Sequence, residues 1–173
     1  DDGLTINHSE VCRNISNKTK AIIPVDFAGR FSKCYWVKKN DEFIPIIRDS
    51  AHKVGKFKYS NVQCHSFYAT KNMSTGQGGM FVTNDKEIYE RARLYWRDGL
   101  SSSTHDRITG KSWDYKVEVM SGGYDGNDIA AAIGRVQLSK LPEFTRKRNQ
   151  IVERYNRAFG TAWQGNHLYP YFV

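Results

Sequence analysis

Residues 66–80 read SFYATKNMSTGQGGM, and they place Lys71 between a short apolar run and a turn that is dense in glycine. A lysine at the end of a buried strand is costly to desolvate. One chemical reason to keep it there is a lowered amine pKa, which leaves a neutral amine that can attack a carbonyl group. Pyridoxal phosphate supplies such a carbonyl. The stretch therefore indicates a lysine that binds this cofactor.

The same stretch resembles the lysine motif of the DegT/DnrJ/EryC1/StrS family of sugar aminotransferases, S-F-x-A-x-K-N followed by T-x-G-E-G-G-M. The resemblance implies that Lys71 carries pyridoxal 5'-phosphate covalently, and a lysine here argues against the family's sugar 3-dehydratase branch, which has histidine. Three further segments resemble the family in the family's own order. They are TKAIIPVDFAG at 19–29, IIRDSAHKVG at 46–55 and NDIAAAIGRVQL at 127–138.

Three more cofactor-binding residues follow from the resemblance, and each has a structural alternative. Asp49 matches the carboxylate that keeps the pyridine nitrogen protonated, but by spacing alone it could equally cap a helix. His52 matches the residue that stacks on the ring, and the alternative is a core or loop histidine bound to backbone. Ser66 matches the serine that binds the phosphate, and the alternative is a strand serine bonded to its own backbone. Asn72 is interpreted as a turn-stabilising residue.

One segment departs from the family pattern. Residues 124–128 align with Y-N-M-x-D, in which a partner subunit's asparagine reaches the cofactor phosphate, and Asp125 takes the place of that asparagine. A carboxylate repels a phosphate at close range. Asn127 could substitute through a shifted loop, so it completes the expected cofactor-binding set. Arg48 also stands where the family has glutamate.

The hydrophobic pattern predicts an α/β sheet. The resemblance implies a mixed, mostly parallel sheet flanked by helices, as in part of the large domain of fold-type I aminotransferases. Between 99 and 126 the sequence predicts a long loop with one hairpin around 113–119. Pro142 is expected to bend or restart the helical chain. The expected strands are 21–25, 43–47, 63–68 and 79–83, and the expected helices are 85–97, 128–141 and 143–159.

The resemblance also sets the expected domain organisation. Residues 1–142 would be part of the large domain that binds pyridoxal phosphate, and residues 143–173 a helix and tail leading towards a smaller C-terminal domain. The chain would then be a fragment or a naturally reduced relative. The upstream loop and helix start that usually hold part of the cofactor phosphate would lie outside it.

Charge and cysteine content are compatible with this function but do not identify it. The 173 residues carry a formal net charge of +8 with a pI near 9.4, which suits an anionic nucleotide-sugar diphosphate. Lysine and arginine are scattered, so a solvated helix face is favoured over a nucleic-acid surface, even for the densest cluster, 146–148. Three cysteines without metal-like spacing favour a reducing compartment, and no apolar run reaches membrane-span length. We expect a cytoplasmic protein with no metal and no membrane partner.

The resemblance implies an aminotransferase of a nucleotide-linked keto-sugar, of the kind used in polysaccharide biosynthesis. It would depend on pyridoxal phosphate, take glutamate as amino donor and complete its site in a homodimer. The alternative is a non-catalytic or degenerate relative that acts as an interaction module. Lys71, Asp49 and His52 together favour the enzyme, whereas Asp125 favours the module.

Overall fold

The computed structural model describes residues 4–55, 59–102, 108–110 and 114–163. The chain divides into two compact units. The first consists of Asp1–Val82 together with Asp128–Val173, and the second is Thr83–Asn127. The second unit is therefore inserted in the sequence between a strand and a long helix of the first.

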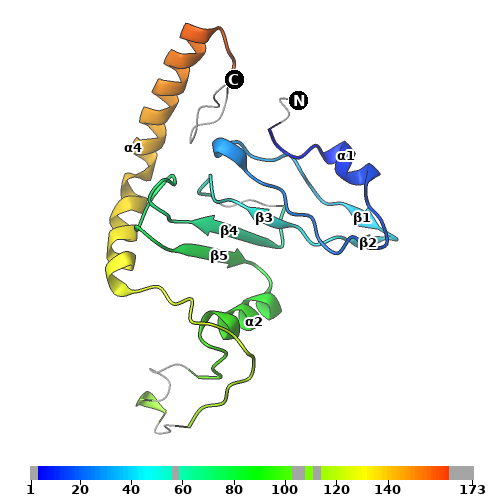
Figure 1. The fold of residues 1–173 in the computed structure, drawn as a ribbon, viewed down its shortest axis with the longest axis vertical. Helices are drawn as coiled ribbons and strands as arrows, with labels where there is room; N and C mark the ends of the chain where they lie inside the picture. The colour runs from blue at the N-terminus through cyan, green and yellow to red at the C-terminus, as the bar shows by residue number, and fades with distance from the viewer. Residues whose placement is uncertain (1–3, 56–58, 103–107, 111–113, 164–173) are drawn as a thin grey trace. The chain divides into compact units, whose positions relative to one another are not determined.

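A three-stranded sheet forms the centre of the first unit, in the order β3 (Ile47–Asp49), β4 (Val62–Ser66) and β5 (Gly79–Thr83) (Figure 1). Strands β3 and β4 are parallel and pair Asp49 with Cys64. The arrow of β5 runs opposite to that of β4. Because the side chains at the ends of β3 and β4 meet at one edge, this edge collects polar groups from separate segments.

The predicted strand at 21–25 lies alongside β3, but it is irregular. Ile22 bridges Ile46 and Val25 bridges Asp49, both in parallel. Pro24 between them has no N–H to donate, which limits the pairing to isolated bridges. The segment is not buried on both faces as expected, since Ile22 is 5% exposed and Ile23 is 60% exposed.

The predicted strand at 43–47 is divided in two, which corrects the sequence expectation. Its start belongs to a small hairpin of β1 (Lys38–Lys39) and β2 (Glu42–Phe43), and its end begins β3. The hairpin turn is Asn40-Asp41, both with positive φ, as a two-residue turn between antiparallel strands requires. Next to this hairpin lies the hydrophobic core, made of Ile22, Cys34, Val37, Ile44 and Ile46, with Val11 of α1 (His8–Arg13) and Ile15 packed against it.

One long helix, α4 (Asp128–Phe159), replaces the two helices that were expected to meet at Pro142. The helix begins where predicted, directly after Asn127, but it continues through the proline. A proline costs a helix one backbone hydrogen bond. The helical turns on both sides of Pro142 remain hydrogen-bonded, so the helix continues through it. The predicted restart at Pro142 is therefore wrong.

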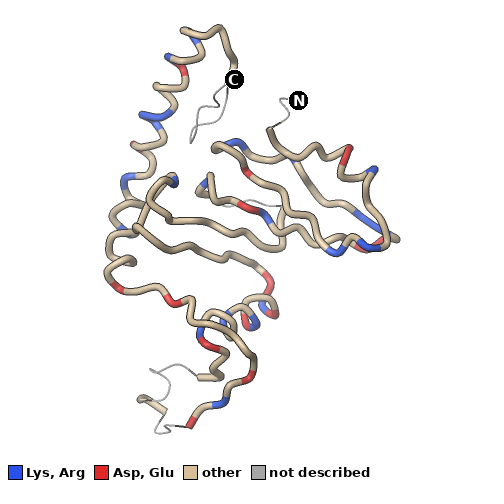
Figure 2. The backbone as a smooth tube through the Cα atoms, in the orientation of Figure 1, with Lys and Arg blue, Asp and Glu red and all other residues tan. Residues whose placement is uncertain are grey.

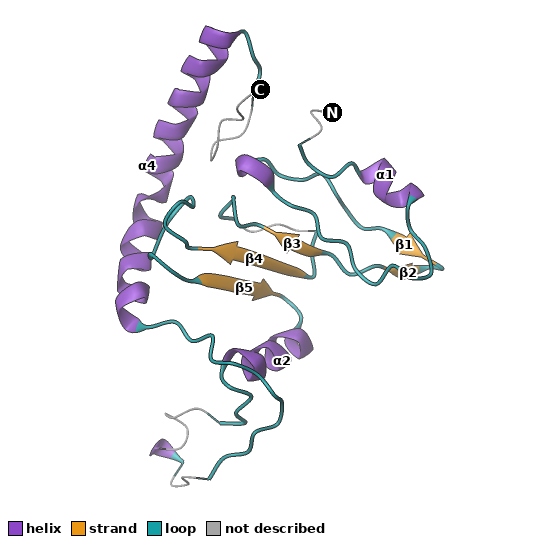
Figure 3. Ribbon diagram, in the orientation of Figure 1, coloured by secondary structure: helices purple, strands orange, loops and turns teal. Residues whose placement is uncertain are grey.

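The second unit contains α2 (Lys86–Trp96), close to the predicted helix at 85–97. Its N-cap is Asp85, whose carboxylate accepts from the Ile88 N–H at 3.1 Å. Outside α2, the residues of this unit that the structure describes are mostly loop (Figure 3). The bridges Arg97 to Gly123 and Leu100 to Val117 join distant arms of this loop, not the predicted hairpin at 113–119, of which residue 113 lies outside the described residues.

Lysine and arginine residues recur along the described chain without forming one continuous block in the sequence, and several belong to α4 (Figure 2). Within the residues described, no helix combines the length and apolar character that a membrane crossing requires. The same residues contain no group of three or more histidine, cysteine, aspartate or glutamate side chains that could hold a metal ion.

Candidate cofactor site

Lys71 lies in a closed turn between β4 and β5. Its backbone N–H donates to the carbonyl of Tyr68 at 3.0 Å, and the N–H of Thr75 returns to the carbonyl of Phe67 at 2.9 Å. Lys71 is half-buried, and Asn72 beside it is buried. The lysine is therefore held by backbone hydrogen bonds at the edge where β4 ends.

Helix α4 packs on this turn from the other half of the sequence. The guanidinium of Arg148 donates to the carbonyl of Asn72 at 3.1 Å. A Cβ added at Gly134 would lie 3.1 Å from the Thr75 methyl group, so glycine lets the helix approach closely. Burial lowers the pKa of Arg148. Helix α4 therefore contacts the backbone of Asn72, the residue directly after Lys71.

Asp49 ends β3 at the same edge of the sheet. Its carboxylate accepts from the Ala51 N–H at 2.9 Å, which closes a turn of the kind that aspartate favours. No helix follows within 50–55, so the helix-cap alternative is wrong. In the described part of the chain, Ala51 occupies only one of the two carboxylate oxygens, and Asp49 is half-buried. A second hydrogen-bond donor can therefore be accepted.

His52 follows on the loop after β3. Its Nδ1 accepts from the backbone N–H of Ala28 at 3.3 Å, and its ring lies 5.6 Å from that of Phe27. An accepting Nδ1 requires the neutral imidazole with its proton on Nε2. Burial lowers the pKa of His52, the positive charge of Lys71 lowers it further, and Asp49 opposes both. Lys71 and Asp49 therefore both lie near enough to His52 for their charges to act on its imidazole.

The remaining predicted residues, Ser66 and Asn127, belong to different units of the chain. Ser66 ends β4, is half-buried, and its Oγ accepts from the Tyr68 N–H at 3.3 Å. This is the local backbone bond weighed as an alternative, and it leaves the hydroxyl proton available to another acceptor. Asn127 and Asp125 belong to the second unit, and their position is described only within that unit.

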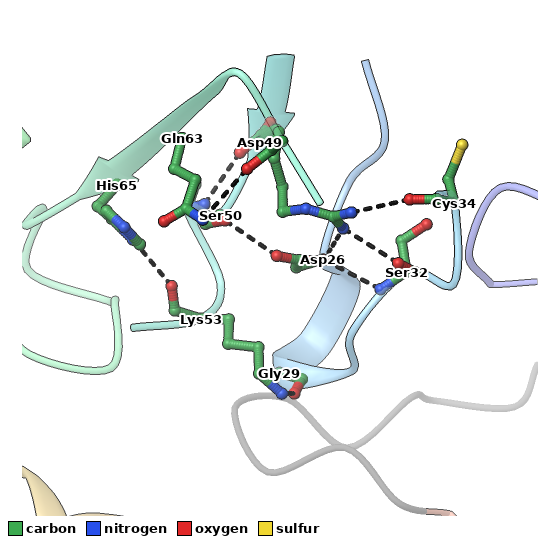
Figure 4. A network of polar contacts seen from close by, with 12 residues as sticks. Asp26, Gly29, Ser32, Cys34, Asp49, Ser50, Lys53, Gln63 and His65 are labelled. Carbon is green, nitrogen blue, oxygen red and sulfur yellow. Dashed lines mark hydrogen bonds and ion pairs between the residues drawn. The ribbon is translucent and has the colours of Figure 1, made fainter. Parts of the chain in front are cut away.

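A buried polar network beside Asp49 was not predicted. Arg48 and Asp26 form an ion pair at 2.9 Å, with both side chains fully buried (Figure 4). The guanidinium also donates to the carbonyls of Ser32 and Cys34, and the Ser50 hydroxyl donates to Asp26. The departure at Arg48 was visible in the sequence. Its compensating partner was not, because the pairing depends on the parallel register of 22–25 with β3.

The side chains at this edge suit pyridoxal phosphate. An amine can take up the aldehyde, a carboxylate can meet the ring nitrogen, a neutral aromatic ring can stack, and a hydroxyl can bind the phosphate. Lys71, Asp49, His52 and Ser66 supply these four groups. The donor chemistry therefore fits the cofactor.

The chain matches the DegT/DnrJ/EryC1/StrS aminotransferase family over residues 1–168 and belongs to that family. It is 33% identical over 193 residues to MJ1066 of Methanocaldococcus jannaschii, covering 97% of this chain and 49% of MJ1066. It is 34% identical to SpsC of Bacillus subtilis, a spore coat polysaccharide biosynthesis protein, covering 90% of this chain and 43% of SpsC. The chain thus spans about half the length of these curated relatives.

Solved structures agree with this assignment. Spr1654 of Streptococcus pneumoniae, a candidate sugar aminotransferase in its PMP form, matches with a TM-score of 0.76 at 26% identity, covering 91% of this chain and 47% of Spr1654. Its PLP form also matches with a TM-score of 0.76, at 25% identity over 92% of this chain and 46% of Spr1654. The predicted fold class is confirmed, as is pyridoxal phosphate as the cofactor among relatives.

Proposed function

We propose that this chain is the cofactor-binding part of a sugar aminotransferase and binds pyridoxal 5'-phosphate at Lys71. The observation that carries the proposal is that Asp49 and Ser66 end the parallel strands β3 and β4, with His52 and Lys71 on the segments that directly follow these strands. Membership of an aminotransferase family supports the same conclusion.

Each residue has a role that its surroundings support. Lys71 Nζ is the point of attachment and can carry a proton between neighbouring atoms. The carboxylate of Asp49 holds a proton on the pyridine nitrogen, and the neutral ring of His52 stacks. The Ser66 hydroxyl donates to the phosphate, and Asn127 is proposed as a further phosphate ligand. The bound cofactor supplies the electron sink that amino-group transfer needs.

The finer assignment is also a proposal. The substrate is a nucleotide-linked keto-sugar and the amino donor is glutamate, as the family resemblance implies, and a net charge of +8 suits a diphosphate. Residues 1–142 belong to the large domain, 143–173 lead towards a smaller one, and a homodimer completes the site. All three cysteines are free, which suits the reducing cytoplasm.

The test is the absorbance spectrum of the chain with added pyridoxal phosphate, before and after borohydride reduction. The proposal predicts a borohydride-sensitive cofactor band that is lost in Lys71→Ala. Lys86→Ala is the matched control, because the Lys86 side chain is 87% exposed and lies on α2. A band that persists in Lys71→Ala would overturn the proposal. No band in the parent would favour the interaction module, to which Asp125 in place of asparagine points.

A further inference from the structure

The carboxylate of Asp26 holds the residues on both sides of Asp49. It is fully buried and accepts from Arg48 Nη1, from Ser50 Oγ and from the Ser32 N–H, each at 2.9 Å (Figure 4). The backbone N–H of Asp26 donates to the Asp49 carbonyl, also at 2.9 Å. Arg48 and Ser50 are the immediate neighbours of Asp49. One side chain thus fixes the backbone from which the Asp49 carboxylate projects.

The residues after Asp26 hold the loop that follows Asp49 in the same way. The Ala28 N–H donates to His52 Nδ1 at 3.3 Å, and Lys53 Nζ donates to the Gly29 carbonyl at 2.8 Å. Ala28 has a φ of 53°, a left-handed conformation that an alanine rarely adopts. Backbone strain of this kind is commonly found at functional sites.

Stability alone does not account for the pair at the centre of this network. Two buried charges lose their hydration, and a well-packed apolar pair of similar volume is often as stable or more so. A buried ion pair does specify one geometry, because Arg48 must satisfy Asp26 and the two carbonyls at once. A site that binds a cofactor needs its side chains fixed to within about 0.5 Å of their productive positions.

We infer that Asp26 is a positioning residue, which orients the Asp49 carboxylate and the His52 ring towards the cofactor. This inference rests on the proposed function. Asp26 touches neither substrate nor cofactor, since its carboxylate is fully buried and occupied by Arg48, Ser50 and Ser32. Its effect is transmitted through the backbone of 48–53.

Two sets of variants test the inference on the full chain. The double variant Asp26→Leu/Arg48→Met replaces the ion pair by apolar side chains, and Ser50→Ala removes one contact and leaves the ion pair intact. Glu143→Leu/Arg146→Met is the matched control, because that ion pair lies on the surface of α4. Asp49→Asn marks complete loss of the carboxylate. Circular dichroism and urea unfolding identify the variants that fold.

The readouts are the Kd for pyridoxal phosphate and the nitrogen-15 NMR shift of cofactor labelled at the pyridine nitrogen, which reports whether that nitrogen is protonated. We expect Kd to rise at least 10-fold in the double variant and about 3-fold in Ser50→Ala, with the shift moving towards that of Asp49→Asn. The surface control should match the parent. Only variants that fold are compared, so a change in this shift reports the cofactor site and not a general loss of structure.

The inference is overturned by the following result. The parent binds cofactor at Lys71, and both Ser50→Ala and the folded double variant have a Kd within twofold of the parent's and the same nitrogen-15 shift. Should the double variant not fold, Ser50→Ala decides. If the parent takes up no cofactor at Lys71, the proposed function and this inference fall together.

Discussion

The imidazole of His52 is held neutral by its surroundings. Its Nδ1 must keep a lone pair to accept from Ala28, and burial and Lys71 both lower its pKa. In the unfolded chain a histidine takes up a proton near pH 6.5. The unfolded state therefore binds more protons than the folded state as pH falls through that value, and the free energy of unfolding must decrease.

Replacing His52 by glutamine should remove this part of the pH dependence. A glutamine carbonyl can still accept from the Ala28 N–H but does not titrate. We expect the parent to lose stability relative to His52→Gln as pH falls from about 8 to about 5, the range in which histidine titrates. Urea unfolding at several pH values measures the difference, with His8→Gln in α1 as the control. Parallel pH profiles for the parent and His52→Gln would contradict the account.

Lys71, Asp49 and His52 could be proposed as cofactor-binding residues because each lies in a motif that the chain itself displays. Asp26 could not be assigned in this way. Its partners Arg48 and Ser50 are 22 and 24 residues away, and they reach it only because Val25 pairs with Asp49 in a parallel register. Sequence reasoning marked Arg48 as a departure from the family, and the structure explains it as half of a buried pair.

Arg148 is the link between α4 and the turn that carries Lys71. It is two residues from Arg146 on the same helix, but the two side chains differ in surroundings. Arg148 is half-buried and donates to the Asn72 carbonyl, whereas Arg146 pairs with Glu143 at the surface. Identical substitutions at the two positions therefore separate the contact between α4 and the turn from the general loss of a charge.

We expect Arg148→Met to lower the free energy of unfolding by about 1–3 kcal/mol, because a hydrogen bond from a charged donor is lost and a backbone carbonyl is left without it. Arg146→Met should cost less than about 1 kcal/mol, as exposed ion pairs do. Arg148→Met should also slow the borohydride-sensitive uptake of pyridoxal phosphate at Lys71. Urea titration and the absorbance time course measure the two effects, and equal losses in both variants would be the contrary result.

The helices and strands were predictable to different degrees for physical reasons. The helix α2 has a clear acidic cap and a periodic apolar face, and its predicted bounds are close to those observed. The continuity of α4 across Pro142 could not be seen in the sequence, because a local rule about proline opposes the helix-forming residues on both sides. The division of 43–47 reflects two different pairing partners, since Phe43 pairs with Lys38 across the Asn40-Asp41 turn and Ile47 pairs with Val62.

Buried side chains are distributed unevenly between the two units. The hydrophobic core lies within 22–46, in the first unit. Of the described residues in Thr83–Asn127, only Gly99 is buried. Local stability follows the amount of buried apolar surface and the protection of backbone hydrogen bonds. The two units should therefore open with different free energies.

Hydrogen exchange followed by mass spectrometry tests this expectation. Peptides from 22–50 should exchange slowest, and peptides from α2 and the bridged arms of its loop should exchange earlier. Addition of pyridoxal phosphate should slow exchange further in 48–53 and around Lys71, because ligand binding stabilises the state that binds it. Uniform exchange across both units would show that the uneven core does not govern local opening.

The central claim is that one lysine among many is the cofactor lysine, and peptide mapping tests it most directly. The chain is incubated with limiting pyridoxal phosphate, reduced with borohydride, digested and analysed by mass spectrometry at every lysine. The account predicts that the added mass concentrates on the peptide containing Lys71, and that Asp49→Asn reduces this selectivity. Modification spread over the exposed lysines in proportion to their exposure, with Lys71 no different from Lys86, would contradict it.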